Sequence, residues 1–418
     1  MSKSKPFTPA RRRLILLQAG LLPLSVLLPL SLRAQEHGMA GHGAAPAAPA
    51  SGAKPARKPR PQLASGAALA PDGAVWLAML DAQGRLVTQR SADLGRSWSA
   101  PRPLDIGDEK PSADGENHPK IAFGPRGQVA ISYTRPLSKP FTGEIRLLHS
   151  SDGGAHFSAP ATVHQDRQEI THRFESIAFD GQGRLHVVWI DKRDLELAKK
   201  AGRDYEGAAI YRNVSTDGGA SFGADQLLAA NSCECCRIAL APDAQGRLAA
   251  FWRHVWPGQV RDHGFARLEE GAAVQRASQD GWVVAGCPHH GGDLTAASDG
   301  GWHAVWFGVR DGVGVPRYGR LDADGRPQGP VRALPDETAE HASLARAGRR
   351  LAISWRSFDG QRMRWRAWVS EDEGRSFTLR ELGHTTGASD YARLLSDGRR
   401  LIALWRCDGE PGARLVEL

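Results

Sequence analysis

The chain has 418 residues, with 54 Lys and Arg against 46 Asp and Glu, and a formal net charge of +8 at pH 7. Residues 1–62 hold ten of the basic residues and a single acid, so residues 63–418 are close to neutral. Nucleic-acid-binding proteins carry a basic patch or stripe, and this charge balance excludes that function class.

Residues 1–34 have the features of an export signal. Three arginines at 11–13 precede an apolar stretch over 14–32, and Ala34 offers a small residue for cleavage. The arginines suit either the general secretory (Sec) route or the twin-arginine route. We therefore expect a periplasmic or secreted protein with no membrane span after cleavage, the alternative being a signal retained as an anchor.

Residues 35–62 are rich in Ala, Pro and Gly and show no hydrophobic period. Such a segment cannot bury enough apolar surface to fold, so it is predicted to be a disordered linker. The folded domain is expected to cover residues 63–418.

One pattern recurs seven times in residues 63–418: a short apolar strand, a turn with glycine, and a second apolar strand that usually ends in an aromatic residue. Intervals of 49 to 63 residues between these ends suit blades of four strands. The sequence thus predicts an all-β protein, a β-propeller with seven blades, or with six if the first and last repeats merge. The second strands cover residues 75–79, 129–133, 185–189, 248–252, 302–306, 351–355 and 401–405.

Four copies of the pattern Ser-x-Asp-x-Gly-x-x-aromatic lie between these repeats. The Asp is expected to accept hydrogen bonds from turn amides, the Gly to adopt a positive φ, and the aromatic ring to pack into the blade. The pattern resembles the Asp-box (BNR) repeat of the sialidase superfamily over residues 63–418, which implies a structural role on the outer side of a propeller. The Asp, Gly and aromatic positions are Asp93, Gly95, Trp98, Asp152, Gly154, Phe157, Asp217, Gly219, Phe222, Asp372, Gly374 and Phe377.

The segments before the first strands are expected to converge at one mouth of the propeller. Adjacent strands of a blade are antiparallel, so the start of the first strand and the end of the second lie on the same face. A small ligand, a glycan or an envelope protein is expected to bind there. The segments cover residues 116–118, 172–175, 233–237, 287–290, 340–341 and 390–391.

Four of the five cysteines and two histidines gather in the mouth segments of two adjacent repeats. Thiolate and imidazole ligands suit Cu(I) or zinc. An exported protein can instead join its cysteines in disulfides, because it meets an oxidising compartment. We expect a metal site, with copper first and zinc second, and keep two disulfides that staple the blades as the alternative. The predicted ligands are Cys233, Cys235, Cys236, Cys287, His289 and His290.

This region is similar to an exported sialidase-like subfamily with a Cys-x-Cys-Cys turn and a Gly-Cys-Pro segment. Sialidases bind the substrate carboxylate with an arginine triad and use a Tyr nucleophile activated by Glu. Their Phe/Tyr-Arg-Ile-Pro motif is missing, since residues 62–66 read Gln-Leu-Ala-Ser-Gly. The resemblance still implies Tyr391 as a nucleophile and Glu175 as its partner. The arginines that it offers for a carboxylate are Arg173, Arg237, Arg253 and Arg406.

The sequence therefore predicts an exported propeller that binds a soft metal ion, copper before zinc, at its mouth. It would act in the cell envelope as a binding or metal-handling protein rather than as an enzyme. The first alternative is a glycoside hydrolase similar to exo-sialidases, and the second is an interaction scaffold stapled by disulfides. The sequence leaves open the metal, the partner and the substrate.

Overall fold

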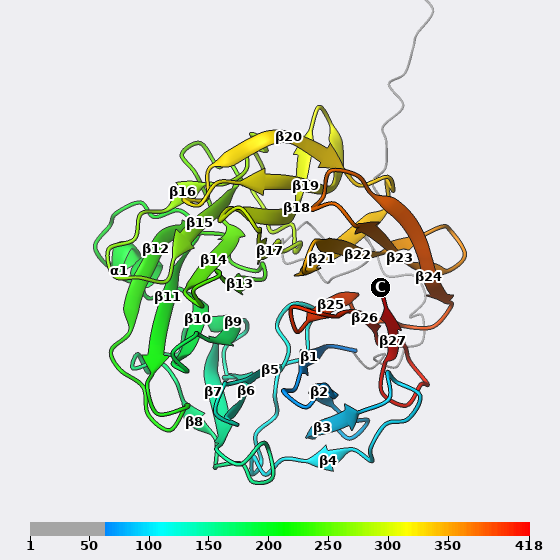
Figure 1. The fold of residues 1–418 in the computed structure, drawn as a ribbon. Helices are drawn as coiled ribbons and strands as arrows, with labels where there is room; N and C mark the ends of the chain where they lie inside the picture. The colour runs from blue at the N-terminus through cyan, green and yellow to red at the C-terminus, as the bar shows by residue number, and fades with distance from the viewer. Residues whose placement is uncertain (1–62) are drawn as a thin grey trace, which may run out of the picture. The chain divides into compact units, whose positions relative to one another are not determined.

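The computed structural model describes residues 63–418, which form seven antiparallel sheets around one axis (Figure 1). The strands of each sheet follow chain order from the axis outwards. This confirms the all-β, seven-bladed propeller, and the six-bladed alternative is wrong. The predicted signal over residues 1–34 and the predicted linker over residues 35–62 lie outside the described residues.

The first four blades have four strands each. Blade 1 contains β1 (Ser65–Leu69), β2 (Val75–Leu80), β3 (Leu86–Ser91) and β4 (Arg102–Pro103). Blade 2 contains β5 (Lys120–Phe123), β6 (Val129–Pro136), β7 (Gly143–Ser150) and β8 (Ala161–Thr162). Blade 3 contains β9 (His172–Phe179), β10 (Leu185–Asp191), β11 (Ala208–Ser215) and β12 (Gln226–Ser232). Blade 4 contains β13 (Ala239–Pro242), β14 (Leu248–Arg253), β15 (His263–Arg267) and β16 (Gln275–Arg276).

Blades 5 and 6 also have four strands each, whereas blade 7 has three. Blade 5 contains β17 (Asp293–Ala296), β18 (Trp302–Arg310), β19 (Val313–Leu321) and β20 (Pro327–Ala333). Blade 6 contains β21 (Ala339–Ala347), β22 (Arg350–Phe358), β23 (Met363–Ser370) and β24 (Thr378–Thr385). Blade 7 has three strands, β25 (Arg393–Ser396), β26 (Leu401–Trp405) and β27 (Arg414–Glu417).

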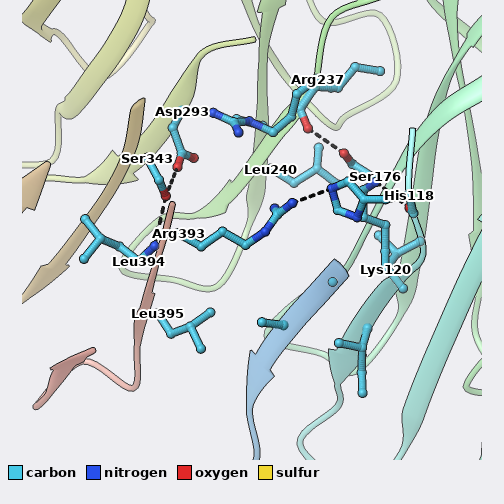
Figure 2. A pocket seen from close by; sticks show the side chains of 16 residues that line it. His118, Lys120, Ser176, Arg237, Leu240, Asp293, Ser343, Arg393, Leu394 and Leu395 are labelled. Carbon is cyan, nitrogen blue, oxygen red and sulfur yellow. Dashed lines mark hydrogen bonds between the residues drawn. The ribbon is translucent and has the colours of Figure 1, made fainter. Parts of the chain in front are cut away.

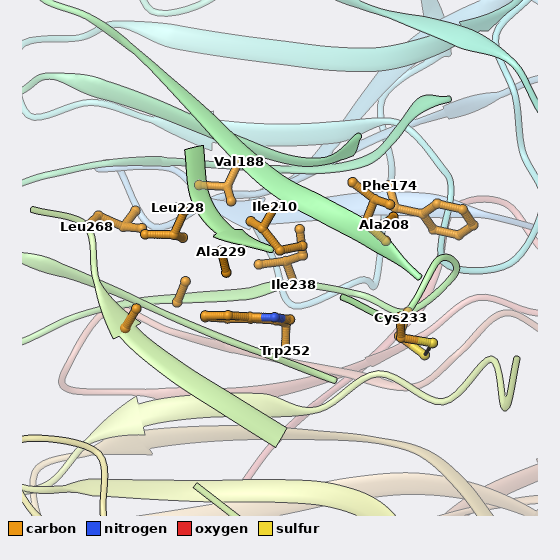
Figure 3. Close-up of a cluster of buried hydrophobic side chains, with 14 of the residues drawn as sticks. Phe174, Val188, Ala208, Ile210, Leu228, Ala229, Cys233, Ile238, Trp252 and Leu268 are labelled. Carbon is orange, nitrogen blue, oxygen red and sulfur yellow. Dashed lines mark hydrogen bonds between the residues drawn. The ribbon is translucent and has the colours of Figure 1, made fainter. Parts of the chain in front are cut away.

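The hydrophobic core is divided among the gaps between neighbouring blades. All six residues of β14 are buried, because both faces of the blade are covered, and such strands read as continuous apolar runs. Figure 3 shows one of these clusters, in which Val188 and Ile210 of blade 3 pack against Ile238 and Trp252. Cys233 belongs to the same cluster.

The ring closes between blade 1 and blade 7 without exchange of a strand. The innermost strand of blade 1, β1, packs against β25, the innermost strand of blade 7. The backbone N–H and the hydroxyl of Ser65 donate to Oδ2 of Asp390 at 2.8 and 2.6 Å. Leu77 packs in one cluster with Ile402 and Leu404. Side-chain packing and these hydrogen bonds hold the closing interface.

The four Asp boxes occupy equivalent turns between the third and fourth strands of blades 1, 2, 3 and 6. In each turn the Ser hydroxyl donates to Oδ1 of the Asp, at 2.7 to 2.9 Å. The amide four residues after the Asp donates to the same oxygen, at 2.9 Å in every copy. Gly219 has a φ of +105° and lies against Leu147 of the preceding blade. The boxes therefore lie on the face opposite the mouth and pack a blade against its neighbour.

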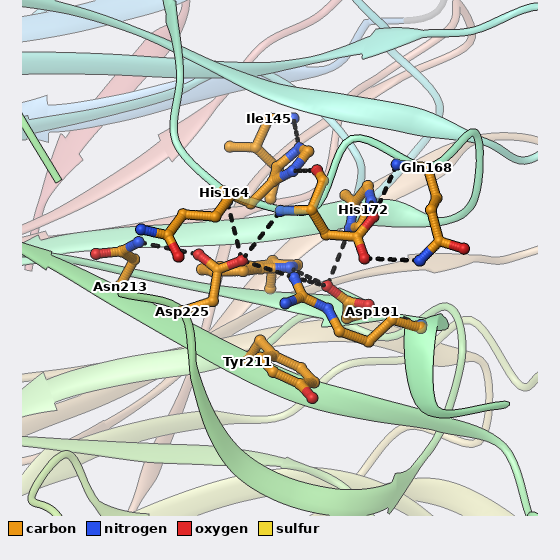
Figure 4. A network of polar contacts seen from close by, with 12 residues as sticks. Ile145, His164, Gln168, His172, Asp191, Tyr211, Asn213 and Asp225 are labelled. Carbon is orange, nitrogen blue, oxygen red and sulfur yellow. Dashed lines mark hydrogen bonds and ion pairs between the residues drawn. The ribbon is translucent and has the colours of Figure 1, made fainter. Parts of the chain in front are cut away.

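A short helix, α1 (Arg193–Lys200), follows β10 on the mouth side of blade 3. The buried carboxylate of Asp191 anchors it, since Oδ2 accepts hydrogen bonds from Trp189 at 2.8 Å and from Arg193 at 2.7 Å (Figure 4). The same oxygen lies 2.9 Å from Nδ1 of His172, and Arg193 also pairs with Asp225 at 2.8 Å. Across residues 63–418 no helix combines the length and the apolar character of a membrane span.

Candidate functional site at the mouth of the propeller

The mouth segments do converge across the axis, as the strand geometry predicted. Glu116, which precedes β5, is buried and makes contact with two other blades. Its Oε1 accepts a hydrogen bond from Nδ1 of His341 at 3.1 Å, and its Oε2 lies 3.5 Å from Nη1 of Arg237. Burial alone would raise the pKa of Glu116, but the Arg237 guanidinium and the His341 hydrogen bond hold it well below its usual value. An ionised carboxylate therefore lies at the centre of the mouth.

A row of stacked rings runs beside Glu116. The ring centroid of His341 lies 4.5 Å from that of His290 and 3.5 Å from that of Tyr391. The guanidinium of Arg356 lies 4.6 Å from the centroid of Tyr391. Burial lowers the pKa of both histidines, so both imidazoles are neutral near pH 7. Burial and the charge of Glu116 raise the pKa of Tyr391, so its hydroxyl stays protonated.

Four cysteines gather where the core between blades 3 and 4 reaches the mouth. The Sγ atom of Cys233 lies 3.9 Å from that of Cys235 and 3.7 Å from that of Cys236. The sulfurs of Cys233, Cys235 and Cys287 lie within 4.8 Å of one another. We call these four residues the thiol group. All five cysteines of the described chain are free, so the structure does not contain the predicted alternative of two disulfides.

The thiol group shares its protons unevenly. Hydrogen bonds from Cys235 and Cys236, together with Cys287, lower the pKa of Cys233 well below its usual value. The same contacts raise the pKa of Cys235 and Cys236, and they raise the pKa of Cys287 to about 11. Within the thiol group, the contacts among the four sulfurs thus favour the thiolate form at Cys233 over the other three.

The two predicted histidine ligands do not join the thiol group. His290 belongs to a second group with Glu340 and His341, whose ligand atoms lie within 4.8 Å of one another. His289 is exposed and has a φ of +56°. The structure therefore places the predicted cysteine ligands and His290 in two different groups of ligand atoms. Cys407 lies in the core between blades 6 and 7.

The structure does not bring together the residues that the sialidase resemblance implies. Glu175 accepts hydrogen bonds from Ser132 at 3.1 Å and from Thr134 at 2.9 Å. Burial raises its pKa, and the opposing charge is that of Lys120. The carboxylates that act on Tyr391 are instead those of Glu116, Glu340 and Asp390. The hydrogen bonds of Glu175 therefore run to blade 2.

The implied arginines are largely engaged with the protein itself. Arg173 pairs with Asp114 at 2.5 Å. Arg237 donates to the backbone carbonyls of residues 292 and 342 and faces Glu116. Arg253 is 1% exposed and donates to three backbone carbonyls, those of residues 261, 290 and 307. Arg406 lies at the mouth end of β26, where burial lowers its pKa. The arginines therefore do not form a preorganised triad for a substrate carboxylate.

An axial cavity of about 250 Å³ opens below the mouth, lined by the innermost strands of all seven blades (Figure 2). Lys120, Arg237 and Arg393 bring cationic side chains to it. Arg393 donates to Nε2 of His118 at 2.7 Å, and burial lowers the pKa of Lys120 to about 8. The sequence analysis missed Lys120 and Arg393, because it considered the segments before the first strands. Both residues lie within innermost strands, β5 and β25.

No protein-family model and no curated protein matches the sequence of this chain. Solved structures are similar in fold. A polysaccharide lyase of family PL25, an ulvan lyase, aligns with a TM-score of 0.50 and 11% identity over 85% of this chain and 96% of its own. A Hadza microbial sialidase aligns at 0.49 and 13% identity, over 78% of this chain and 72% of its own. An α-L-arabinanase of Penicillium chrysogenum aligns at 0.47 and 12% identity, over 85% and 92%. The alignment with the ulvan lyase shows a likeness in fold.

Proposed function

We propose that this propeller binds a soft metal ion, Cu(I) before zinc, in its thiol group. The observation that carries the proposal is the spacing of the free sulfurs, 3.7 and 3.9 Å from Cys233 to Cys236 and Cys235. Thiolates bound to one metal ion at about 2.3 Å in tetrahedral geometry lie about 3.8 Å apart. Structural zinc sites have four ligands, whereas only three sulfurs of the thiol group lie within 4.8 Å of one another. Thiolates are soft ligands that suit Cu(I), so we place Cu(I) before zinc.

The surroundings of the thiol group support this proposal. Three of its members are buried and Cys287 is exposed. An ion can therefore enter from the mouth past Cys287 and bind where the protein shields it from solvent. Lys192, at the start of α1, pairs with Glu234 within the cysteine turn at 2.5 Å. This ion pair links the cysteine turn to the start of α1. Together with the export signal predicted for residues 1–34, this supports a metal-handling role in the cell envelope.

Reduced protein is expected to bind at least one equivalent of Cu(I), and the double variant Cys235→Ser/Cys236→Ser should lose most of it. Binding displaces thiol protons, so affinity should weaken as the pH falls. Competition with a chromophoric Cu(I) chelator under anaerobic conditions measures both effects. Cys407→Ser is the matched control, because Cys407 lies outside the thiol group. Equal losses in the control and the double variant, or two disulfides in protein purified without reductant, would contradict the proposal.

A second candidate is binding or cleavage of an acidic saccharide at the mouth, as in a glycoside hydrolase similar to sialidases. The cations of the axial cavity favour it, and the fold neighbours include an ulvan lyase bound to a saccharide of GlcA and Rha3S, and a sialidase. Tyr391, which the sialidase resemblance implies as a nucleophile, is partly accessible beside Arg356. The raised pKa of Tyr391, and the hydrogen bonds that Glu175 accepts from Ser132 and Thr134, rank this candidate second.

We expect no release of sialic acid from an aryl sialoside, because Tyr391 stays protonated without a catalytic base. Hydrolysis is followed by the absorbance of the released phenol. Tyr391→Phe tests the nucleophile, and Tyr205→Phe, in the loop after α1, is the control. If the wild type hydrolyses the sialoside, and if Tyr391→Phe abolishes this activity while Tyr205→Phe retains it, the glycoside hydrolase becomes the first candidate.

A further inference from the structure

His290, Glu340 and His341 form a second set of ligand atoms at the mouth, which we call the histidine group. One atom from each lies within 4.8 Å of the others. His290 ends the segment before β17, and the other two residues lie at the start of β21, so blades 5 and 6 supply the group together. Cys287 and His290 belong to the same segment, which places the two candidate metal sites side by side along the chain.

A backbone irregularity lies at this position of β21. Glu340 pairs with Arg356 and Ser343 pairs with Ser354, so two residues lie opposite Trp355 alone. Neighbouring residues of a regular strand point to opposite faces, and a β-bulge removes this alternation. His341 has a φ of +51°, a conformation that costs free energy for a residue with a side chain. The bulge lets both Glu340 and His341 contribute to the histidine group.

The side chains of the histidine group are already held in place. Nδ1 of His341 is fixed by Glu116 at 3.1 Å, which leaves Nε2 as its ligand atom. A carboxylate behind a histidine is the usual outer partner of a metal-binding imidazole. Arg356 donates to Oε1 of Glu340 at 2.8 Å, so the second oxygen can reach an ion. Nδ1 of His290 is buried without a hydrogen-bond partner, while its ring stacks on Phe307 at 4.3 Å.

We propose that the histidine group binds a divalent cation of borderline softness, with Zn(II) as the reference ion. Two imidazoles and one carboxylate form the ligand set of a catalytic zinc site, which keeps one position open for water or substrate. The thiol group offers only sulfur and therefore selects a softer ion. The mouth would then hold two ions of different chemistry. This proposal does not depend on metal binding by the thiol group.

Zn(II) binding to the Cys235→Ser/Cys236→Ser variant tests the proposal, because that background weakens the competing thiol group. Isothermal titration is expected to show one equivalent. His290→Ala or Glu340→Gln, added to this background, should weaken binding by more than about 100-fold. His289→Asn is the matched control and should bind as the background does, since His289 is exposed and Asn tolerates its positive φ.

Co(II) in place of Zn(II) gives a second readout. The cysteine variant should show visible d–d bands without a sulfur charge-transfer band, and His290→Ala should remove them. Glu340→Gln keeps a hydrogen-bond acceptor for Arg356, and its thermal unfolding shows whether the fold persists. A cysteine variant that binds no Zn(II), or a folded Glu340→Gln variant that binds it unchanged, overturns the proposal. If the wild type does not bind Cu(I), the proposal for the thiol group fails and the proposal for the histidine group is unaffected.

Discussion

Replacing Glu116 by Ala is expected to lower the free energy of unfolding by about 3–5 kcal/mol. The carboxylate is 4% exposed and faces Arg237 and His341, which come from two other blades. Its removal leaves the buried guanidinium without its counter-charge and opens contacts between blades 2, 4 and 6. Denaturation by urea measures the loss. Glu371→Ala is the control, because Glu371 is 62% exposed, pairs with Arg350 on the surface and should cost less than about 1 kcal/mol.

The effect of Glu116 is also expected to depend on pH. Its pKa in the folded chain lies well below the usual value of 4.5, so the unfolded chain binds the proton more tightly. The stabilisation is therefore fully present above about pH 4.5 and is lost as the pH falls through the folded-state pKa. The difference in the free energy of unfolding between the wild type and Glu116→Ala should therefore decrease as the pH falls below about 4.5. An equal difference at pH 7 and pH 3 would show that the carboxylate charge has no part in it.

Arg253→Met is expected to have an effect of similar size, about 3–5 kcal/mol. Arg253 donates to the backbone carbonyls of Arg261 at 2.9 Å, His290 at 3.0 Å and Phe307 at 2.7 Å. Methionine fills part of the volume but leaves three buried acceptors without a donor. One of these acceptors, the carbonyl of His290, belongs to the segment that also contains Cys287. Cu(I) binding by the thiol group should therefore weaken in the same variant.

Arg247→Met is the matched control for this prediction. Arg247 lies in the turn that precedes β14, is 56% exposed, and pairs with Asp243 at 2.9 Å on the surface. Its replacement should change stability by less than about 1 kcal/mol. Chemical denaturation and Cu(I) competition, carried out on both variants, separate loss of fold from loss of the site. Equal stability of the two variants would mean that the three carbonyls find other donors.

The repeat could be predicted from the sequence because each blade encodes its own strands and turns locally. The turn glycine, the apolar second strand and the Asp box all act within a few residues, as the hydrogen bond from Ser221 to Asp217 illustrates. The position of the mouth followed from strand direction alone. Blade number was settled by closure, since β1 completes blade 1 and leaves blade 7 with three strands.

The detailed pairing within the mouth could not be predicted in the same way. Glu116 meets His341 across 225 residues of chain, and no local pattern marks that pair. Glu340 and His341 were placed at the mouth by their position before a first strand, but a regular strand would have pointed them apart. The bulge in β21 and the positive φ of His289 redirect side chains by one residue, which sequence periodicity does not reveal.

The closed ring between blades 1 and 7 bears on how this chain could be rearranged. Because every sheet is built from one uninterrupted stretch of chain, a cut between any two blades leaves all seven sheets whole. Propellers that borrow a strand to complete their last sheet lose this property at one position. Circular permutation at a blade boundary would place the new termini at the mouth, because each boundary is a segment that precedes a first strand.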